Sequence, residues 1–272
     1  MRHRGSRRTS TRSFILTTLT ACAAVLFLLT AAAPAGAYVG LGPDWSGYGV
    51  ARPGVRFDQV SASWRVPTAT CSAGGVRYSL VWVGLGDETG LQQIGTETDC
   101  GSSGSAAGSV AYATPFWEIL PLPEQHTSFV LMPGDLVHAS VTIAGHQITM
   151  ELVDRTRRWT FVKRAHRANV DESSAEWMVE DPLHCPGLTV PIDELCPERP
   201  FANFSKTTIS EAQARTTTGR SGSISSPLWT ATERELVAGR PPFVAAAPTP
   251  LSAGGTAFSV SRTHRPLPPE PV

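Results

Sequence analysis

The sequence lacks the patterns that assign many hydrolases to a catalytic class. It contains no Gly-x-Ser-x-Gly turn to present a serine nucleophile, and residues 101–105 have the composition of a flexible loop. Its 7 histidines occur singly, without the spacing of metal ligands. Serine-hydrolase and metal-dependent chemistry therefore have little support, and we expect no metal ion or other cofactor.

Sustained helical periodicity is also missing from Trp45 onward. Short runs of alternating or apolar residues are broken by glycine and proline, of which the 272 residues include 24 and 22. Residues 231–238 fit a strand or a short helix, and residues 256–262 are predicted to be the closing strand. No internal repeat or interdomain linker is found. Strands at this spacing predict one all-β domain, an antiparallel β-sandwich.

The first 37 residues have the features of a secretory signal peptide. Arginines precede an apolar run from Phe14 to about Ala33, and Ala35-Gly36-Ala37 supplies small residues for cleavage. We predict cleavage after Ala37, a sandwich domain over residues 38–264 and a Pro-rich tail over residues 265–272. A signal anchor is the alternative, because the apolar run is nearly long enough to span a bilayer.

Positive charge is scarce once this leader is removed. The leader carries five of the 23 Lys and Arg residues and none of the 23 Asp and Glu residues, which leaves a net charge of about −5. Nucleic acid and anionic membranes are therefore not expected as partners. We expect a secreted, extracellular protein without stable membrane association after cleavage.

Four cysteines remain after the leader, namely Cys71, Cys100, Cys185 and Cys196. An even number in an exported protein indicates two disulfides, which would exclude a cysteine nucleophile. Of the three possible pairings we favour the local ones, Cys71–Cys100 and Cys185–Cys196. A zinc site that uses His184 is an alternative, but the spacing matches no familiar cluster.

Two carboxylates share one face of a predicted strand. In an extended chain Glu176, Met178 and Glu180 face one side, and Trp177 and Val179 face the other. One explanation is that this strand lies at a sheet edge with both glutamates in water. The other is that they face inward, where buried carboxylates must be paired or take part in function. Retaining glycosidases hold two carboxyls about 5–5.5 Å apart. Here the Cα atoms would be about 13 Å apart at ~3.3 Å per residue, with a methionine between them.

Several segments occur in an order that is more specific than any single motif. They are Asp44-Trp45-Ser46-Gly47-Tyr48, Phe57 to Pro67, Val81-Trp82-Val83-Gly84-Leu85-Gly86, Gln92 to Cys100, Trp117-Glu118, Gly134-Asp135 and Ala175 to Asp181. From roughly Trp45 to Arg262 the chain thereby resembles the glutamic peptidases, also called eqolisins or the G1/A4 group, and especially their bacterial branch.

This resemblance implies a two-sheet sandwich of the concanavalin A-like lectin type. It also implies endopeptidase activity on a protein or peptide substrate, and we expect the protein to be a monomer. The catalytic glutamine of the family matches Gln93. The catalytic glutamate matches Glu180, the second acid of Ala-Glu-Trp-x-x-Glu. Trp82 and Glu118 match positions near the substrate cleft, and we also assign Phe116 to substrate binding. Residues 115–120 depart from the family's aromatic-rich sequence at this point, which concerns the subsites for the substrate.

The two side chains suit peptide hydrolysis. Glu180 as a carboxylate could take a proton from water and later pass it to the leaving amine. The amide of Gln93 could donate to the oxyanion and help orient the water. Activity is expected on the acid side of neutral. The alternatives are a lectin-like or carbohydrate-binding sandwich without catalysis, and a glycosidase that uses Glu176 with Glu180.

Overall fold

The computed structural model describes residues 38–71, 77–102, 109–182 and 201–268, all within one unit, Ala37–Val272. The predicted signal peptide lies outside the described residues, as do Cys185, Cys196 and the last residues of the predicted tail. Within the described ranges, no helix has the length and apolar character needed to cross a membrane.

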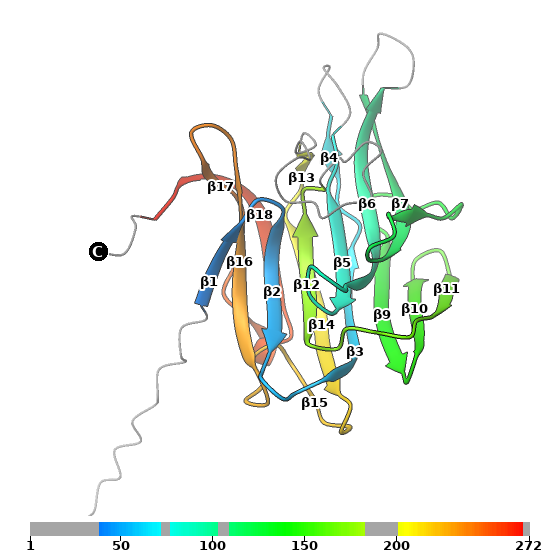
Figure 1. The fold of residues 1–272 in the computed structure, drawn as a ribbon. Helices are drawn as coiled ribbons and strands as arrows, with labels where there is room; N and C mark the ends of the chain where they lie inside the picture. The colour runs from blue at the N-terminus through cyan, green and yellow to red at the C-terminus, as the bar shows by residue number, and fades with distance from the viewer. Residues whose placement is uncertain (1–37, 72–76, 103–108, 183–200, 269–272) are drawn as a thin grey trace, which may run out of the picture. The chain divides into compact units, whose positions relative to one another are not determined.

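Almost every regular element of the described chain is a strand, as the short alternating runs predict (Figure 1). A short 3-10 helix, η1 (Ala253–Gly255), is the exception among the described elements. The strands in chain order are β1 (Tyr38–Gly42), β2 (Trp45–Ala51), β3 (Phe57–Arg65), β4 (Ala69–Thr70), β5 (Leu80–Leu85), β6 (Gln92–Ser102), β7 (Ser109–Ile119), β8 (Gln125–His126), β9 (Leu136–Ala144), β10 (Gln147–Asp154), β11 (Trp159–His166), β12 (Ser174–Glu180), β13 (Asn203–Phe204), β14 (Thr207–Thr216), β15 (Ser221–Gly222), β16 (Thr230–Ala238), β17 (Phe243–Pro248) and β18 (Phe258–Pro266).

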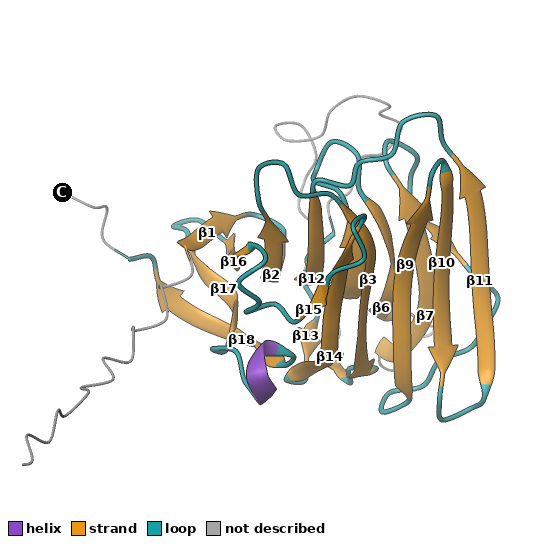
Figure 2. Ribbon diagram, turned by 90° about the horizontal axis from the view of Figure 1, so that it is seen from below, coloured by secondary structure: helices purple, strands orange, loops and turns teal. Residues whose placement is uncertain are grey.

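The main sheet is one hydrogen-bonded path that folds back over itself. Its order is β11-β10-β9-β3-β14-β18-β17-β16-β2-β12-β5-β6-β7-β8. Along this path the pairs are antiparallel, and β1 joins β16 in parallel. Across the fold β3 packs on β5 and β12, and β9 packs on β6. The result is the predicted two-layer antiparallel β-sandwich, which Figures 1 and 2 show from two sides.

The core lies between these layers and follows from strand alternation. On β3, Val60, Ala62 and Trp64 are buried, in line with their period of two. Trp177 of β12 is also buried, and its indole N–H donates to the Ser61 carbonyl oxygen at 2.9 Å. Burying one large apolar side chain contributes roughly 1.5–3 kcal/mol. Trp177 therefore stabilises the packing of one layer on the other.

Sheet pairing settles two points near the C-terminus. The segment that fits either a strand or a short helix is strand β16, paired with β2 and β17. The predicted closing strand is β18, which pairs with β14 and β17. It continues to Pro266, so it includes the first residues of the predicted Pro-rich tail.

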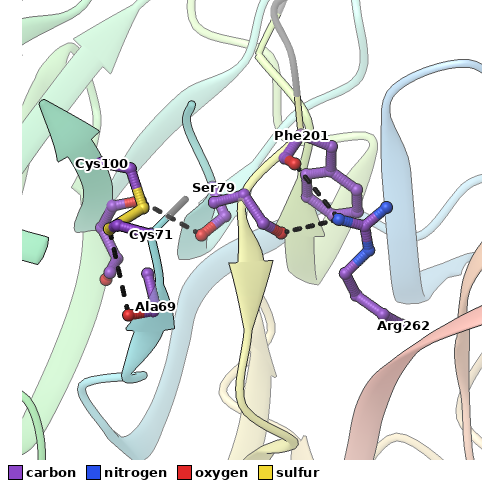
Figure 3. The surroundings of a disulfide bond; sticks show 8 residues. Ala69, Cys71, Ser79, Cys100, Phe201 and Arg262 are labelled. Carbon is purple, nitrogen blue, oxygen red and sulfur yellow. Dashed lines mark hydrogen bonds between the residues drawn. A yellow bond between two sulfur atoms is a disulfide. The ribbon is translucent and has the colours of Figure 1, made fainter. Parts of the chain in front are cut away.

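A disulfide joins Cys71 to Cys100, with Cα atoms 5.4 Å apart. Cys71 directly follows β4 and lies beside Ala69, while Cys100 belongs to β6 (Figure 3). The backbone N–H of Cys100 also donates to the Arg77 carbonyl oxygen at 2.8 Å. The structure thus contains the predicted Cys71–Cys100 bridge, while the predicted Cys185–Cys196 bridge falls outside the described residues.

Candidate active site

Strand β12 carries its two glutamates on one face and core residues on the other. Ala175, Trp177 and Val179 belong to the main core between the layers. Glu176 and Glu180 alternate with them and therefore point away from that core. This second face has a small apolar cluster of its own, formed by Trp45, Leu80, Trp82, Leu91, Phe116 and Met178.

The sheet register places the other predicted site residues on the same face as these glutamates. Cross-strand partners share a face, so one row across β12, β5, β6 and β7 consists of Glu176, Gly84, Gln93 and Glu118. Glu180 lies two rows further along β12, beside Leu80 of β5. The register therefore brings Gln93, Glu118 and Glu180 to one side of one sheet.

Trp82 and Glu180 form the first polar pair of the site. The indole N–H of Trp82 donates to Glu180 Oε2 at 2.6 Å. The Trp82 ring meets the Trp45 ring edge to face, with centroids 5.4 Å apart. Glu180 is partly exposed, whereas Glu176 is 4% exposed. Of the two glutamates on β12, Glu180 is the more exposed residue.

Gln93 and Glu118 form the second polar pair. Gln93 Nε2 donates to Glu118 Oε2 at 2.6 Å. Gln93 is only 3% exposed, and its Oε1 has no partner among the described residues. A buried polar atom without a partner costs about 1–3 kcal/mol, so this oxygen suits a hydrogen bond to water or substrate. The amide is therefore half satisfied by the protein.

The glycine of the Gln-x-Gly pattern has a steric reason. Gly95 stands opposite Trp82 in the register of β5 and β6. A Cβ at Gly95 would lie 2.1 Å from the Val81 carbonyl oxygen, and that backbone atom cannot move aside cheaply. Glycine at this position lets β5 and β6 pair closely and so fixes Gln93 relative to Trp82.

Burial and mutual repulsion raise the pKa values of the acids of this site. Burial raises the pKa of Glu180 well above its usual value; the charges of Asp44 and Glu118 raise it further, and the Trp82 bond opposes the shift. Burial raises the pKa of Glu118 to about 7, against the Gln93 bond. Burial likewise raises the pKa of Asp44 to about 6. Three carboxyls thus share a site that disfavours three charges.

Glu176 behaves as a buried neutral acid. Burial raises its pKa to about 8. The Ser174 hydroxyl donates to Glu176 Oε1 at 3.4 Å, and Oε2 has no partner among the described residues. Glu176 and Glu180 are four residues apart on β12, so their Cα atoms lie about 13 Å apart at ~3.3 Å per residue, whereas a retaining glycosidase holds its carboxyls about 5–5.5 Å apart. The geometry therefore does not favour the Glu176 and Glu180 glycosidase.

The five predicted site residues fall into two pairs and one packing residue. Trp82 meets Glu180, and Gln93 meets Glu118; the hydrogen bonds of Gln93 and Glu180 go to these partners rather than to each other. Trp82 and Phe116 are both 0% exposed within the small apolar cluster. Their exposure gives no support to direct substrate contact, which for both stays a prediction.

Sequence reasoning did not single out Asp44 as a site residue. Its charge acts on Glu180, and the Asp181 N–H donates to the Asp44 carbonyl oxygen at 2.8 Å, which holds the start of β2 beside the end of β12. The available signal was its position in the Asp-Trp-Ser-Gly segment. Its proximity to Glu180 depends on the pairing of strands that are distant in sequence, which the sequence alone does not specify.

A second acidic group, also missed, lies on β6. Glu97 is 1% exposed and pairs with His126 of β8. The bond to Glu97 raises the pKa of His126, and burial raises the pKa of Asp99 to about 8. Ligand atoms of Glu97, Glu124 and His126 lie within 4.8 Å of one another. The ion pair accounts for this arrangement, so we assign no metal ligands here.

Comparisons with known proteins agree on the family. The sequence profile of the peptidase A4 family matches residues 43–235. The comparison with curated proteins gave no match. Scytalido-glutamic peptidase, solved with a peptide-based transition-state analogue, has a TM-score of 0.64 and 22% identity over 81% of this chain and 98% of its own.

Two further solved structures share the fold. SCP-B, a member of the eqolisin family in complex with the tripeptide Ala-Ile-His, has a TM-score of 0.61 and 22% identity over 81% of this chain and 98% of its own. Aspergilloglutamic peptidase from Aspergillus niger has a TM-score of 0.54 and 18% identity over 69% of this chain and 99% of its own. Because the family profile spans most of the described residues, this chain belongs to the peptidase A4 family, that of the glutamic peptidases or eqolisins, and is a glutamic-type endopeptidase.

Proposed function

We propose that the protein is a secreted acid endopeptidase in which Glu180 is the general base and acid and Gln93 binds the oxyanion. The observation that carries this proposal is the difference between the two carboxyls on β12. Glu180 is partly exposed and accepts a bond from Trp82, while Glu176 is buried and outside that contact. Gln93 lies on the same face of the sheet.

The reaction follows from these groups. The Glu180 carboxylate takes a proton from water as the water oxygen bonds to the scissile carbonyl carbon. The resulting oxyanion accepts an N–H bond from Gln93. Glu180 then gives the proton to the leaving nitrogen as the C–N bond breaks. The Trp82 bond favours the carboxylate needed first, and the raised pKa of Glu180 suits the acid needed second.

An acid range of activity is consistent with the neighbouring acids. The pKa of Asp44 is raised to about 6 and that of Glu118 to about 7. Both charges raise the pKa of Glu180. As the pH falls below these values, Asp44 and Glu118 become neutral, and this repulsion on Glu180 disappears. Neutral Asp44 and Glu118 therefore lower the pKa of Glu180 toward the acid range and favour its carboxylate, while burial still raises that pKa.

The substrate class and location are part of this proposal. The related structures hold a peptide-based analogue and a tripeptide, so we assign protein or peptide substrates. The Cys71–Cys100 disulfide is consistent with export. We also propose a signal peptide at residues 1–37 and a sandwich domain at residues 38–264. We propose a monomer that has no nucleic-acid, membrane or cofactor partner.

Digestion of an acid-denatured protein near pH ~4, about the reference pKa of glutamic acid, tests the proposal. The wild-type protein of residues 38–272 should cleave it. Glu180→Gln and Gln93→Ala should each lower kcat by about 10²-fold or more. Glu176→Gln serves as the matched control on the same strand face and should retain activity.

Other outcomes would point elsewhere. A folded wild type with its disulfides intact that cleaves no peptide bond across acidic pH would contradict the proposal and favour the lectin-like alternative. Glycoside hydrolysis lost equally in Glu176→Gln and Glu180→Gln would indicate the glycosidase.

A further inference from the structure

We propose that Glu118 is a positioning residue that sets which end of the Gln93 amide faces the substrate. In its neutral form it would turn the N–H groups of that amide toward the scissile carbonyl. This inference rests on the proposed function and adds a role for the acid that pairs with the oxyanion donor. It concerns the orientation of Gln93, not direct contact of Glu118 with the substrate.

The observed contact defines one of two orientations. Gln93 and Glu118 are direct cross-strand partners on β6 and β7. Gln93 Nε2 donates to Glu118 Oε2 at 2.6 Å, and Oε1 is the buried amide atom without a partner. In this orientation Glu118 accepts from the amide N–H side, so the carbonyl oxygen is the free end. An oxyanion requires donors, so an acceptor at that end is unfavourable for it.

A half-turn of the amide gives the second orientation. The two ends of a glutamine amide have nearly the same shape, and the last side-chain torsion is broad and roughly two-fold. A protonated Glu118 could donate its O–H to Gln93 Oε1 and hold the turned amide at the same separation. Both N–H groups of Gln93 would then be free to donate to the oxyanion. Among the described residues, only the bond to Glu118 would have to be exchanged.

The surroundings of Glu118 favour its neutral form at acid pH. Burial raises its pKa to about 7, and the charge of Glu124 raises it as well. The bond from Gln93 and the backbone N–H of Glu124 act in the opposite direction. Across the sheet face, the charge of Glu118 repels Glu180 of β12. Neutral Glu118 with ionised Glu180 is therefore the charge state that suits both the base and the turned amide.

The two effects are coupled through one proton. When Glu118 holds the proton, Glu180 loses a repulsive neighbour and Gln93 loses an acceptor for its N–H. Interacting acids titrate as a group, so the rate of peptide cleavage should fall where this pair loses its shared proton. If Glu118 had only a structural role, its titration would not produce an alkaline limb in the pH dependence of kcat.

Kinetics of two variants test this role. Glu118→Gln has no charge and keeps an N–H that can donate to Gln93 Oε1, so it imitates the neutral acid. At acid pH its kcat should stay within about tenfold of wild type, and the alkaline limb of its pH profile should move up by about one pH unit or more. Glu118→Leu offers no hydrogen bond. Its kcat should fall by about 10²-fold with little change in KM.

The matched control is Glu151→Gln on β10, which removes a carboxylate from the far layer and should keep the wild-type pH profile. A Glu118→Gln profile that coincides with wild type would overturn the inference. If Glu118→Leu does not fold, the pH at which the alkaline limb of Glu118→Gln lies is sufficient to test the inference. Failure of the proposed function is seen separately, as absence of cleavage by the wild type or persistence of cleavage in Glu180→Gln.

Discussion

Trp82 reaches diagonally across the sheet to Glu180, with its indole N–H 2.6 Å from the carboxyl oxygen. In the register Trp82 stands opposite Met178, so it contacts the glutamate two residues further along β12. Diagonal neighbours on one sheet face lie within reach of long aromatic side chains. This bond favours the ionised form of Glu180, and Trp82→Phe removes it while keeping an aromatic ring at the position.

Trp82→Phe should lower activity by disturbing the general base. Loss of a hydrogen bond to a charged group costs about 1.5–3 kcal/mol, so kcat/KM should fall by roughly tenfold or more. The bond opposes the raised pKa of Glu180, so its loss should raise that pKa further. The part of the kcat/KM profile that follows the ionisation of Glu180 should then move to higher pH. Measurement of kcat/KM against pH checks both effects.

Trp45→Phe is the matched control. Trp45 meets Trp82 edge to face, but its indole N–H is buried without a partner among the described residues. This variant removes an N–H that does not touch Glu180 and should leave the pH profile in place. Equal shifts in both variants would mean that ring packing, not the Trp82 hydrogen bond, tunes Glu180.

Glu176→Gln should keep activity and change the response of stability to pH. The pKa of Glu176 is raised from 4.5 to about 8, so the folded state holds a proton that the unfolded state has lost between these values. The wild type therefore loses stability as the pH rises from about 4.5 to 8, by an amount on the order of a few kcal/mol. Glutamine does not titrate and should escape this loss.

Denaturant unfolding at pH 4 and pH 8 measures this difference. The free energies of unfolding of the wild type and of Glu176→Gln should be similar at pH 4, and the variant should be more stable at pH 8. Glu151→Gln on β10 is the control, because the same substitution is made in a partly exposed carboxyl of the other layer. A constant difference between wild type and Glu176→Gln at both pH values would contradict a buried neutral Glu176.

The buried acids of the described residues should make the protein more stable in acid. The pKa values of Asp44, Asp99, Glu118 and Glu176 are all raised, chiefly by burial. Each of these acids keeps its proton to a higher pH in the folded state than in the unfolded state, so stability falls as the pH rises from the ordinary values of 3.8 for Asp and 4.5 for Glu to the raised values of about 6 to 8. His126 acts in the same direction, since its bond to Glu97 raises its pKa. Melting temperatures at pH 4, 6 and 8 should therefore decrease in that order, and a maximum at pH 8 would contradict this account.

Local patterns were sufficient to predict much of this fold. The period of two on β12 placed Trp177 on the face opposite Glu176 and Glu180, and Trp177 is indeed a core residue, because a strand with one buried face has an alternating sequence. The even number of cysteines and their spacing predicted the Cys71–Cys100 bridge. Order and identity of several short motifs, rather than any periodicity, indicated Gln93 and Glu180.

The remaining features depend on which strands lie side by side. The contact of Gln93 with Glu118 follows from the register of β6 and β7, which one sequence does not specify. Glu97 and His126 meet because the two-residue strand β8 returns beside β7. Trp82 was assigned to the substrate, yet its N–H is taken up by Glu180. Side chains that combine an apolar body with a polar tip are ambiguous until their neighbours are known.

Removal of the disulfide should lower stability and leave catalysis intact. Cys71 and Cys100 are separated by 29 residues, and closing a loop of this size stabilises a domain by about 2–4 kcal/mol, mainly by restricting the unfolded chain. The double variant Cys71→Ala/Cys100→Ala should therefore unfold at lower urea concentration by that free energy. Gln93 lies further along the same strand, held by its pairing with β5 and β7, so kcat at a temperature where the variant is folded should match wild type. A lower kcat in the folded variant would mean that the bridge also fixes the position of β6 in the site.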